Sequence, residues 1–289
     1  MKDDMLGLLI ILGIIAIALY GGINNSKENL AASDNTNSPK TTQKTIRETE
    51  NQITELKKQL KAEEAKVTQS KYKDVVILAL LSRSSNPSKE YVAIRVNSRA
   101  TTTIPVTGWT IKTNYGDTVV IPKASYLFFS GMPNSEENVF LNSKDVLYIV
   151  TGHSPIGVGF RTNKCTGYLD QFQSFTPYLK DNCPLAEKEA PLYIPNNTGN
   201  TACLKYIDSL RQCQINTKNI PVSWTGECKN FIDQKIGYPA CIQTYKNDPD
   251  FYENEWRVYL KRSSSIWTAR NLTLTLYDNE GKIVDILER

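Results

Sequence analysis

The sequence predicts a mainly β protein: a β-sandwich head with a small disulfide-linked α-helical insert, preceded by a transmembrane helix and a helical stalk. Three observations lead to this fold class. After Ser70, short runs of alternating apolar residues are separated by Gly, Pro, Asn and Ser, which is typical of an antiparallel sandwich or barrel. The cysteines all fall between positions 165 and 241. A long apolar segment lies near the N-terminus.

That apolar segment includes LGLLIILGIIAIALYGG, and no charge interrupts it between Asp4 and Lys27. A run of this length can cross the roughly 30 Å hydrocarbon core of a bilayer, so residues 5–25 are predicted to be a transmembrane anchor. A cleaved signal peptide is the alternative. The sequence GGINNS that follows is a poor cleavage site, which favours the anchor.

The cysteines determine the predicted orientation, because the charges on either side of the anchor are too balanced to do so. An even, clustered set of cysteines on a membrane-anchored chain indicates a disulfide framework in an oxidising compartment. The chain is therefore predicted to be a single-pass protein of the cell membrane, with its C-terminal region outside the cytoplasm.

Residues 26–43 are polar and predict a flexible linker. Residues 44–70 predict a helical stalk, in which four apolar residues recur every seven positions and Leu56 occupies a d position between them; the four are Ile46, Ile53, Leu60 and Val67. The pattern fits a short coiled coil that would self-associate. Thr49, Glu63 and Ser70 at the other d positions fit a solvated single helix equally well.

The head divides into residues 71–160, predicted as the sandwich, residues 161–250, a cysteine-rich loop and α-hairpin, and residues 251–289, a C-terminal β-hairpin. The first strand, DVVILALL, is apolar on both faces, which predicts a central or covered strand. The final hairpin either completes the sandwich or forms a second unit. Completion is favoured, because the strand-forming part of this segment, about 34 residues from 256 to 289, is too short for an independent core.

Two parts of the head carry recognisable motifs. The first is EYVAIRVNSRATTTIPVTGWTIKTNYGDTVVIPK, with a Glu-led strand, a Gly-Trp-Thr motif and an Ile-Pro hairpin. The second is LTLYDNEGKIVDIL, with Asp278, Gly281 and Asp285 in an L-x-D-x-x-G-x-x-V-D pattern. Together these segments resemble the lamin-tail domain family, whose last hairpin the second one matches. The resemblance covers roughly 70–150 and 256–289 and implies an immunoglobulin-like β-sandwich. Eukaryotic members of this family follow a coiled coil and bind proteins or nucleic acid, and bacterial members often belong to membrane-anchored or exported proteins. Trp109 is then expected to be a core anchor rather than a ligand-stacking residue.

The stretch GVGFRTNKCTGY, residues 157–168, opens the insert. Thr162 stands where a dinucleotide-binding loop needs its third glycine, and the cysteine spacing does not match a zinc site. The favoured interpretation is a glycine-rich turn that leads to a Cys165–Cys183 disulfide. For the other cysteines, an α-hairpin of 202–213 and 226–236 predicts Cys213–Cys228 and Cys203–Cys241.

The loop that follows carries aromatic rings with basic residues at its entry, and it is a candidate interaction surface; these residues are Arg161, Lys164, Tyr168, Phe172, Phe175 and Tyr178. The alternative, which we favour, is that these aromatics pack onto the sandwich.

No catalytic, cofactor or metal site is expected, and His153 is the chain's one imidazole. The predicted function is a non-enzymatic binding or structural module that contacts an unidentified envelope protein or polymer. An exported hydrolase accessory module and a surface nucleic-acid-binding protein are the alternatives. The net charge of +4 does not favour nucleic acid.

Overall fold

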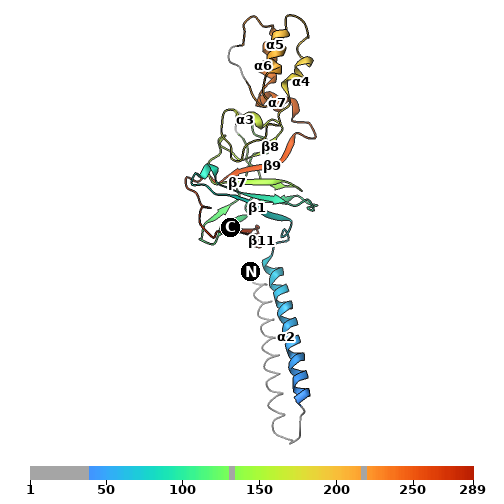
Figure 1. The fold of residues 1–289 in the computed structure, drawn as a ribbon, viewed down its shortest axis with the longest axis vertical. Helices are drawn as coiled ribbons and strands as arrows, with labels where there is room; N and C mark the ends of the chain where they lie inside the picture. Colours follow the sequence, from blue (N-terminus) through green and yellow to red (C-terminus); the bar gives the residue numbers. More distant parts are fainter. Residues whose placement is uncertain (1–38, 130–133, 216–219) are drawn as a thin grey trace. The chain divides into compact units, whose positions relative to one another are not determined.

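The computed structural model describes residues 39–129, 134–215 and 220–289 (Figure 1). The chain divides into two compact units, residues 1–63 and 64–289, and each is described by itself. The predicted anchor, 5–25, and residues 26–38 of the predicted linker lie outside the described residues. Within the described part, no helix is both long enough and apolar enough to cross a membrane.

The predicted stalk is a single helix, α2 (Pro39–Thr68). Its 30 residues give a length of roughly 45 Å at 1.5 Å per residue. The helix begins before the predicted start at residue 44, so residues 39–43 are helical rather than part of a flexible linker. Proline suits a first helical turn, because its missing N–H would have no partner there in any case.

The second unit is built of short strands, with a helical insert between the eighth and the ninth. The strands are β1 (Val76–Ser82), β2 (Tyr91–Val96), β3 (Ile104–Pro105), β4 (Thr110–Thr113), β5 (Thr118–Val120), β6 (Phe140–Leu141), β7 (Val146–Val150), β8 (Phe160–Asn163), β9 (Tyr252–Tyr259), β10 (Thr273–Tyr277) and β11 (Ile283–Glu288). The helices and 3-10 turns are η1 (Pro87–Lys89), α3 (Gly167–Asp170), α4 (Ala186–Glu189), η2 (Ala190–Leu192), α5 (Thr201–Asp208), α6 (Gly226–Lys235) and α7 (Tyr238–Tyr245).

The strands form two main sheets that enclose a common apolar core. Among the described residues, the orders are β1-β2-β7-β9-β8 in a five-stranded sheet and β11-β10-β4-β5 in a four-stranded sheet, with β3 and β6 paired separately. The core takes alternate residues from both sheets, for example Ile94 and Trp256 from one and Ile111 and Leu274 from the other. The head is therefore mainly β and consistent with the predicted sandwich.

The C-terminal segment belongs to this sandwich. Strand β10 pairs with β4, so the final hairpin extends the four-stranded sheet, while β9 lies between β7 and β8 in the other sheet. The pairing of β9 with β7 is parallel. This differs from the all-antiparallel arrangement predicted, because the long insert allows the chain to re-enter the sheet from the same end.

The motifs behind the lamin-tail resemblance have clear structural roles. Trp109 is only 1% exposed and lies in the sandwich core, after Gly108, whose φ of +87° an L-residue rarely adopts. Asp278 accepts hydrogen bonds from the backbone N–H groups of residues 280 and 282, which closes the last hairpin. Asp285 accepts one from Leu78 N at 2.7 Å, which joins the edges of the two sheets.

Strand β1 is an edge strand, so of the two positions that its apolar sequence predicted, central or covered, the central one is wrong. Among the described strands it pairs only with β2, and Ile77 and Leu80 are about two-fifths exposed. The Asp285 contact at its outer edge satisfies a backbone donor that a central strand would give to a neighbouring strand.

All six cysteines lie in the described residues, and they form Cys165–Cys241, Cys183–Cys213 and Cys203–Cys228. The expectation that every cysteine is paired is confirmed, and each predicted partner is wrong: Cys165–Cys183, Cys213–Cys228 and Cys203–Cys241 are not formed.

The pairing differs because α5 and α6 do not form the predicted antiparallel hairpin, in which the end of the first helix would meet the start of the second. Their N-cap residues meet, with Thr225 Oγ1 donating to Asn200 Oδ1 at 2.6 Å, so the two helices begin side by side. Cys203 and Cys228, each in a first turn, therefore face one another. Helix α5 ends at Asp208, which leaves Cys213 in a later turn.

We predict that Glu90→Ala destabilises the head. The Glu90 carboxylate is fully buried and accepts hydrogen bonds from Ile266 N (2.9 Å) and Trp267 N (2.8 Å). Alanine would leave both donors buried without a partner, at a cost of about 2–5 kcal/mol. Urea denaturation measures the change. As a control, Glu280→Ala removes a surface ion pair and should cost less than about 1 kcal/mol; equal effects of the two substitutions would contradict the prediction.

Candidate functional site

The candidate site is the segment 166–182, here called the aromatic loop, which follows β8 and lies against β9. Residues Glu255–Tyr259 of β9 are all buried, because two different cores cover the strand. Trp256 and Val258 face the sandwich core, whereas Tyr259 belongs to a second core formed with the insert. The alternation of a strand directs Arg257 to the same side as Tyr259. The aromatic loop thus lies where the insert meets the sandwich.

Arg257 fixes the middle of the aromatic loop. Its side chain is fully buried, and its Nε donates to Glu255 Oε1 at 2.8 Å. The remaining guanidinium nitrogens donate to backbone carbonyls of the loop, those of Pro177 and of Tyr178, the latter at 2.9 Å. A buried guanidinium needs such partners, since an unpaired charge in the interior is strongly unfavourable. The positions of residues 177 and 178 are therefore tied to the sheet.

Further contacts hold the two arms of the aromatic loop. Gln171 exchanges two hydrogen bonds with the backbone of Ile215, at 2.6 and 2.7 Å. The Asp170 carboxylate accepts one from the backbone N–H of Phe175, and burial raises the pKa of Asp170. Disulfides bind both ends of the loop, through Cys165 on one side and Cys183 on the other. The loop is thus fixed along its length.

The aromatic rings of the loop divide into two inward and two outward ones. Tyr168 and Phe175 are 6% and 2% exposed, and the Phe175 ring packs edge-on against Phe160. Phe172 and Tyr178 are 70% and 84% exposed. Tyr168 and Phe175 therefore pack inward, as the favoured alternative predicted, and are not part of the predicted interaction surface. Phe172 and Tyr178 remain accessible to a partner.

Arg161, predicted at the entry of that surface, is engaged inside the head. Its guanidinium lies 4.9 to 5.8 Å from the ring centroids of Tyr126, Tyr252 and Trp256. It also donates to Tyr126 Oη at 2.7 Å and to Glu253 O at 3.2 Å. This cluster of cation–π contacts and hydrogen bonds closes the sandwich over Trp256.

Lys164 is likewise taken up by intramolecular contacts. Its ammonium lies 3.0 Å from Asp248 and 2.7 Å from Asp250, and it also lies over the Tyr245 ring. The hydrogen bond from Lys164 lowers the pKa of Asp250. Lys164 thus ties the start of the insert to its end, and the predicted basic rim is not free to bind an anionic ligand.

The glycines of GVGFRTNKCTGY serve the fold. Gly157 has a φ of +86° in the turn before β8. At Gly159, a Cβ would come within 2.8 Å of the Arg257 carbonyl oxygen, and at Gly167 it would come within 2.3 Å of Cys213 Sγ. Close packing against a strand and a disulfide therefore explains two of the three glycines.

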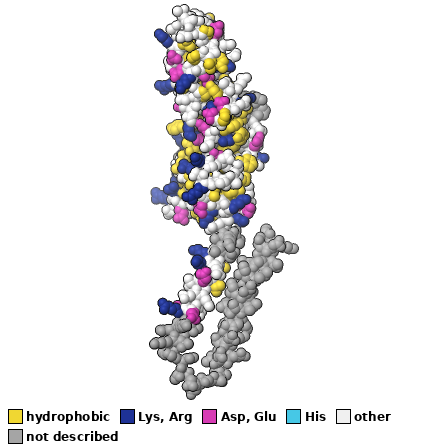
Figure 2. Space-filling view, turned by 90° about the vertical axis from the view of Figure 1, so that its right-hand side faces the viewer, with side chains coloured by type: hydrophobic (Ala, Val, Ile, Leu, Met, Phe, Trp, Pro, Cys, Tyr) yellow, Lys and Arg dark blue, Asp and Glu magenta, His cyan; other side chains and the backbone are white. Residues whose placement is uncertain are grey.

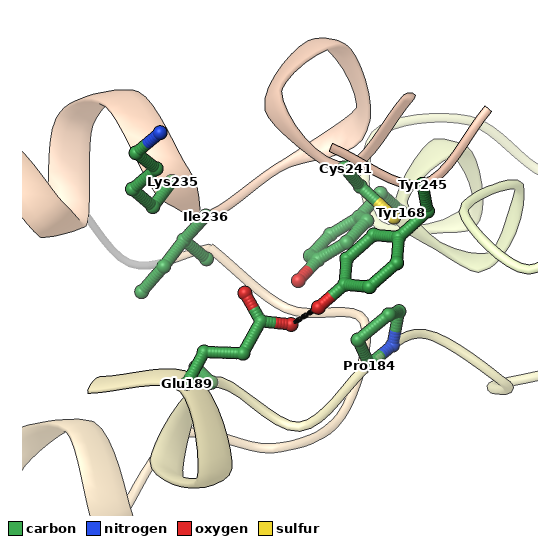
Figure 3. Close-up of a pocket in the computed structure, with 8 residues that line it drawn as sticks. Tyr168, Pro184, Glu189, Lys235, Ile236, Cys241 and Tyr245 are labelled. Carbon is green, nitrogen blue, oxygen red and sulfur yellow. Dashed lines mark hydrogen bonds between the residues drawn. The ribbon is translucent and has the colours of Figure 1, made fainter. Parts of the chain in front are cut away.

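A small pocket lies beside the Cys165–Cys241 disulfide (Figure 3). It is lined by Tyr168, Pro184, Ala186, Glu189, Lys235, Ile236, Cys241 and Tyr245. Glu189 accepts a hydrogen bond from Tyr245 Oη, and burial, together with this contact, raises the pKa of Tyr245. Figure 3 shows the Lys235 ammonium directed away from Glu189. The free volume of about 10 Å³ suits about one water molecule, and His153 lies outside the pocket.

Charge is mixed over the head. On the face shown in Figure 2, basic and acidic side chains are interspersed over the second unit. The insert, residues 164–250, contains equal numbers of basic and acidic residues. Since a nucleic-acid interface needs a concentrated basic patch, the outward aromatic rings are the stronger candidate for recognition.

Sequence reasoning missed the residues that hold the aromatic loop, above all Arg257 with Glu255. A signal was present in EWRVY. In a strand, Glu255 and Arg257 project to the same side, between large apolar neighbours. Opposite charges two positions apart in such a strand indicate a buried pair rather than a solvated face.

We predict that Gly167→Ala destabilises the insert by about 2 kcal/mol or more, because the new methyl group would overlap Cys213 Sγ and the Lys180 carbonyl oxygen. Thermal unfolding under non-reducing conditions measures the effect. Gly226→Ala is the matched control in the same insert, since its Cβ would meet nothing within 4 Å. Wild-type stability of Gly167→Ala would show that the close packing is not as described.

No family model matches this chain, and no curated protein matches it. The resemblance to the lamin-tail domain therefore rests on the residues named above.

Proposed function

We propose that the chain is a single-pass, membrane-anchored extracytoplasmic protein whose head is a non-enzymatic binding module. In this proposal the head binds a protein or polymer of the cell envelope through Phe172 and Tyr178. The observation that carries the proposal is the buried Arg257, which fixes the backbone of residues 177 and 178 while the Tyr178 ring stays 84% exposed.

Rigidity is what makes the outward rings suitable for recognition. A flexible loop must lose conformational freedom when it binds, and that loss weakens binding. The aromatic loop is already held by Arg257, Gln171 and two disulfides. Large aromatic side chains presented in this way are the residues that most often dominate binding energy at interfaces.

The proposed location rests on the cysteines and on the N-terminal sequence. Three disulfides crosslink the insert, and such crosslinks persist in oxidising compartments. The apolar segment 5–25 has the length and composition of a membrane anchor.

The resemblance to lamin-tail domains supports the choice of a binding module over an enzyme. The matching residues serve the fold: Glu90 holds the backbone of residues 266 and 267, Trp109 fills the core and Asp278 closes the last hairpin. Family members bind other macromolecules, and this chain would add the aromatic loop as its own contact surface.

We expect the head to be exposed outside the cytoplasm. Protease added to intact cells should remove a C-terminal epitope, and the uncut protein should stay in the membrane fraction after alkaline extraction. Cysteines should resist alkylation until a reductant is added, because all six are paired. Protection of the epitope together with alkylation in unreduced cells would place the head in the cytoplasm and overturn the proposed location.

We expect the double variant Phe172→Ala with Tyr178→Ala to bind its envelope partner at least about tenfold more weakly, because hot-spot aromatics each contribute on the order of 2 kcal/mol. The readout is capture of partners from envelope fractions by the full chain, titrated to give an apparent Kd. Phe140→Ala is the matched control, since Phe140 is 46% exposed on β6, outside the loop. Equal capture by the double variant and the wild type would rule out the aromatic loop as the binding surface.

A further inference from the structure

Helix α2 carries an open apolar stripe. Ile53, Leu56 and Leu60 are 46%, 64% and 47% exposed, although each is a large aliphatic residue. Their spacing of three and four places them on one face of the helix. Every other residue from Arg47 to Lys61 is polar, so the stripe is a narrow seam in a polar helix. A seam of this kind is the contact surface of a coiled coil.

The order of residues along the seam identifies the partner as a second copy of α2 in the same direction. In a parallel, in-register pair, Ile53 faces Ile53, Leu56 faces Leu56 and Leu60 faces Leu60. In an antiparallel pair, a positions face d positions. One register then sets Leu60 opposite Thr49, and the other sets Ile53 opposite position 63, which is a glutamate. The parallel pair alone matches every apolar residue of the seam with another.

The flanking residues agree with the parallel arrangement. With Ile53 and Leu60 at a positions, the e positions on one side of the seam are Glu50, Lys57 and Glu64. The g positions on the other side are Gln52 and Gln59. In a parallel pair each g residue faces the e residue five positions later in the partner. Gln52 then faces Lys57 and Gln59 faces Glu64, so no like charges meet. Ile at an a position and Leu at a d position also suit a two-stranded coil.

We propose that two copies of the chain pair through α2 as a parallel, in-register, two-stranded coiled coil centred on Leu56. The pairing itself is independent of what the head binds. Its consequence rests on the proposed function: two heads held together would engage a repeated or polymeric partner bivalently, and this raises avidity without any new contact.

Cysteine crosslinking of the full chain in membranes tests the pairing. Ile53→Cys, Leu56→Cys and Leu60→Cys, introduced one at a time, should each yield a disulfide-linked dimer under mild oxidation, because each position faces its copy across the seam. The native cysteines do not interfere, since all of them are already paired. Asn51→Cys and Lys58→Cys, on the opposite face, are the controls and should yield at least about tenfold less dimer. Chains with Ile53→Cys mixed with chains carrying Leu60→Cys should give little mixed dimer, because seven residues of helix separate these positions by about 10 Å.

The outcomes separate the alternative arrangements. Seam positions that crosslink no better than the controls would overturn the pairing, and efficient mixed dimers of positions 53 and 60 would overturn the parallel direction. Ile53→Asp with Leu60→Asp should abolish the Leu56→Cys dimer, because charges would enter the seam. Phe172→Ala with Tyr178→Ala should leave crosslinking unchanged, so failure of the head's binding and failure of the pairing are measured separately.

Discussion

The buried guanidinium of Arg257 is the contact on which the arrangement of the head depends. It lies on β9, a strand covered by the sandwich core on one side and by the insert on the other. Glu255 compensates its charge, and the carbonyls of residues 177 and 178 use its remaining donors. One side chain therefore connects the sheet, the insert and the outward Tyr178. Removal of its partners would leave a charge buried without compensation, so these three parts are energetically coupled.

The insert packs around a second apolar core and is not simply a long loop. Its disulfides link segments distant in the chain, as in Cys165–Cys241, and Lys164 with Asp248 and Asp250 closes the same ends electrostatically. A small apolar core with few regular elements gains much from such crosslinks, because they restrict the unfolded chain. The result is a rigid platform on which Phe172 and Tyr178 stay exposed, and this rigidity supports a role in recognition.

The candidate site was only partly predictable from sequence. The sequence indicates that the glycines, basic residues and aromatics of residues 157–178 belong together, but it does not predict the contacts or the burial of each one. In the sequence, Arg161 and Lys164 cannot be told apart from basic residues that are free on the surface. Only the tertiary contacts show that aromatic rings hold Arg161 and that aspartates hold Lys164. Likewise, Tyr168 and Phe172 differ by four positions and not in chemical class, yet one is buried and the other exposed. Tyr168 packs into the core of the insert, whereas Phe172 is exposed to solvent.

Sequence patterns were enough to predict the stalk helix, the strand-rich head, the pairing of all cysteines and the closure of the last hairpin at Asp278 and Gly281. These follow from periodicity, residue count and turn chemistry, which act over a few residues. Four other features become clear only in the folded chain: the disulfide partners, the edge position of β1, the parallel entry of β9 and the burial of Arg257. Each of these depends on which distant segments meet, and a local pattern carries no information about that.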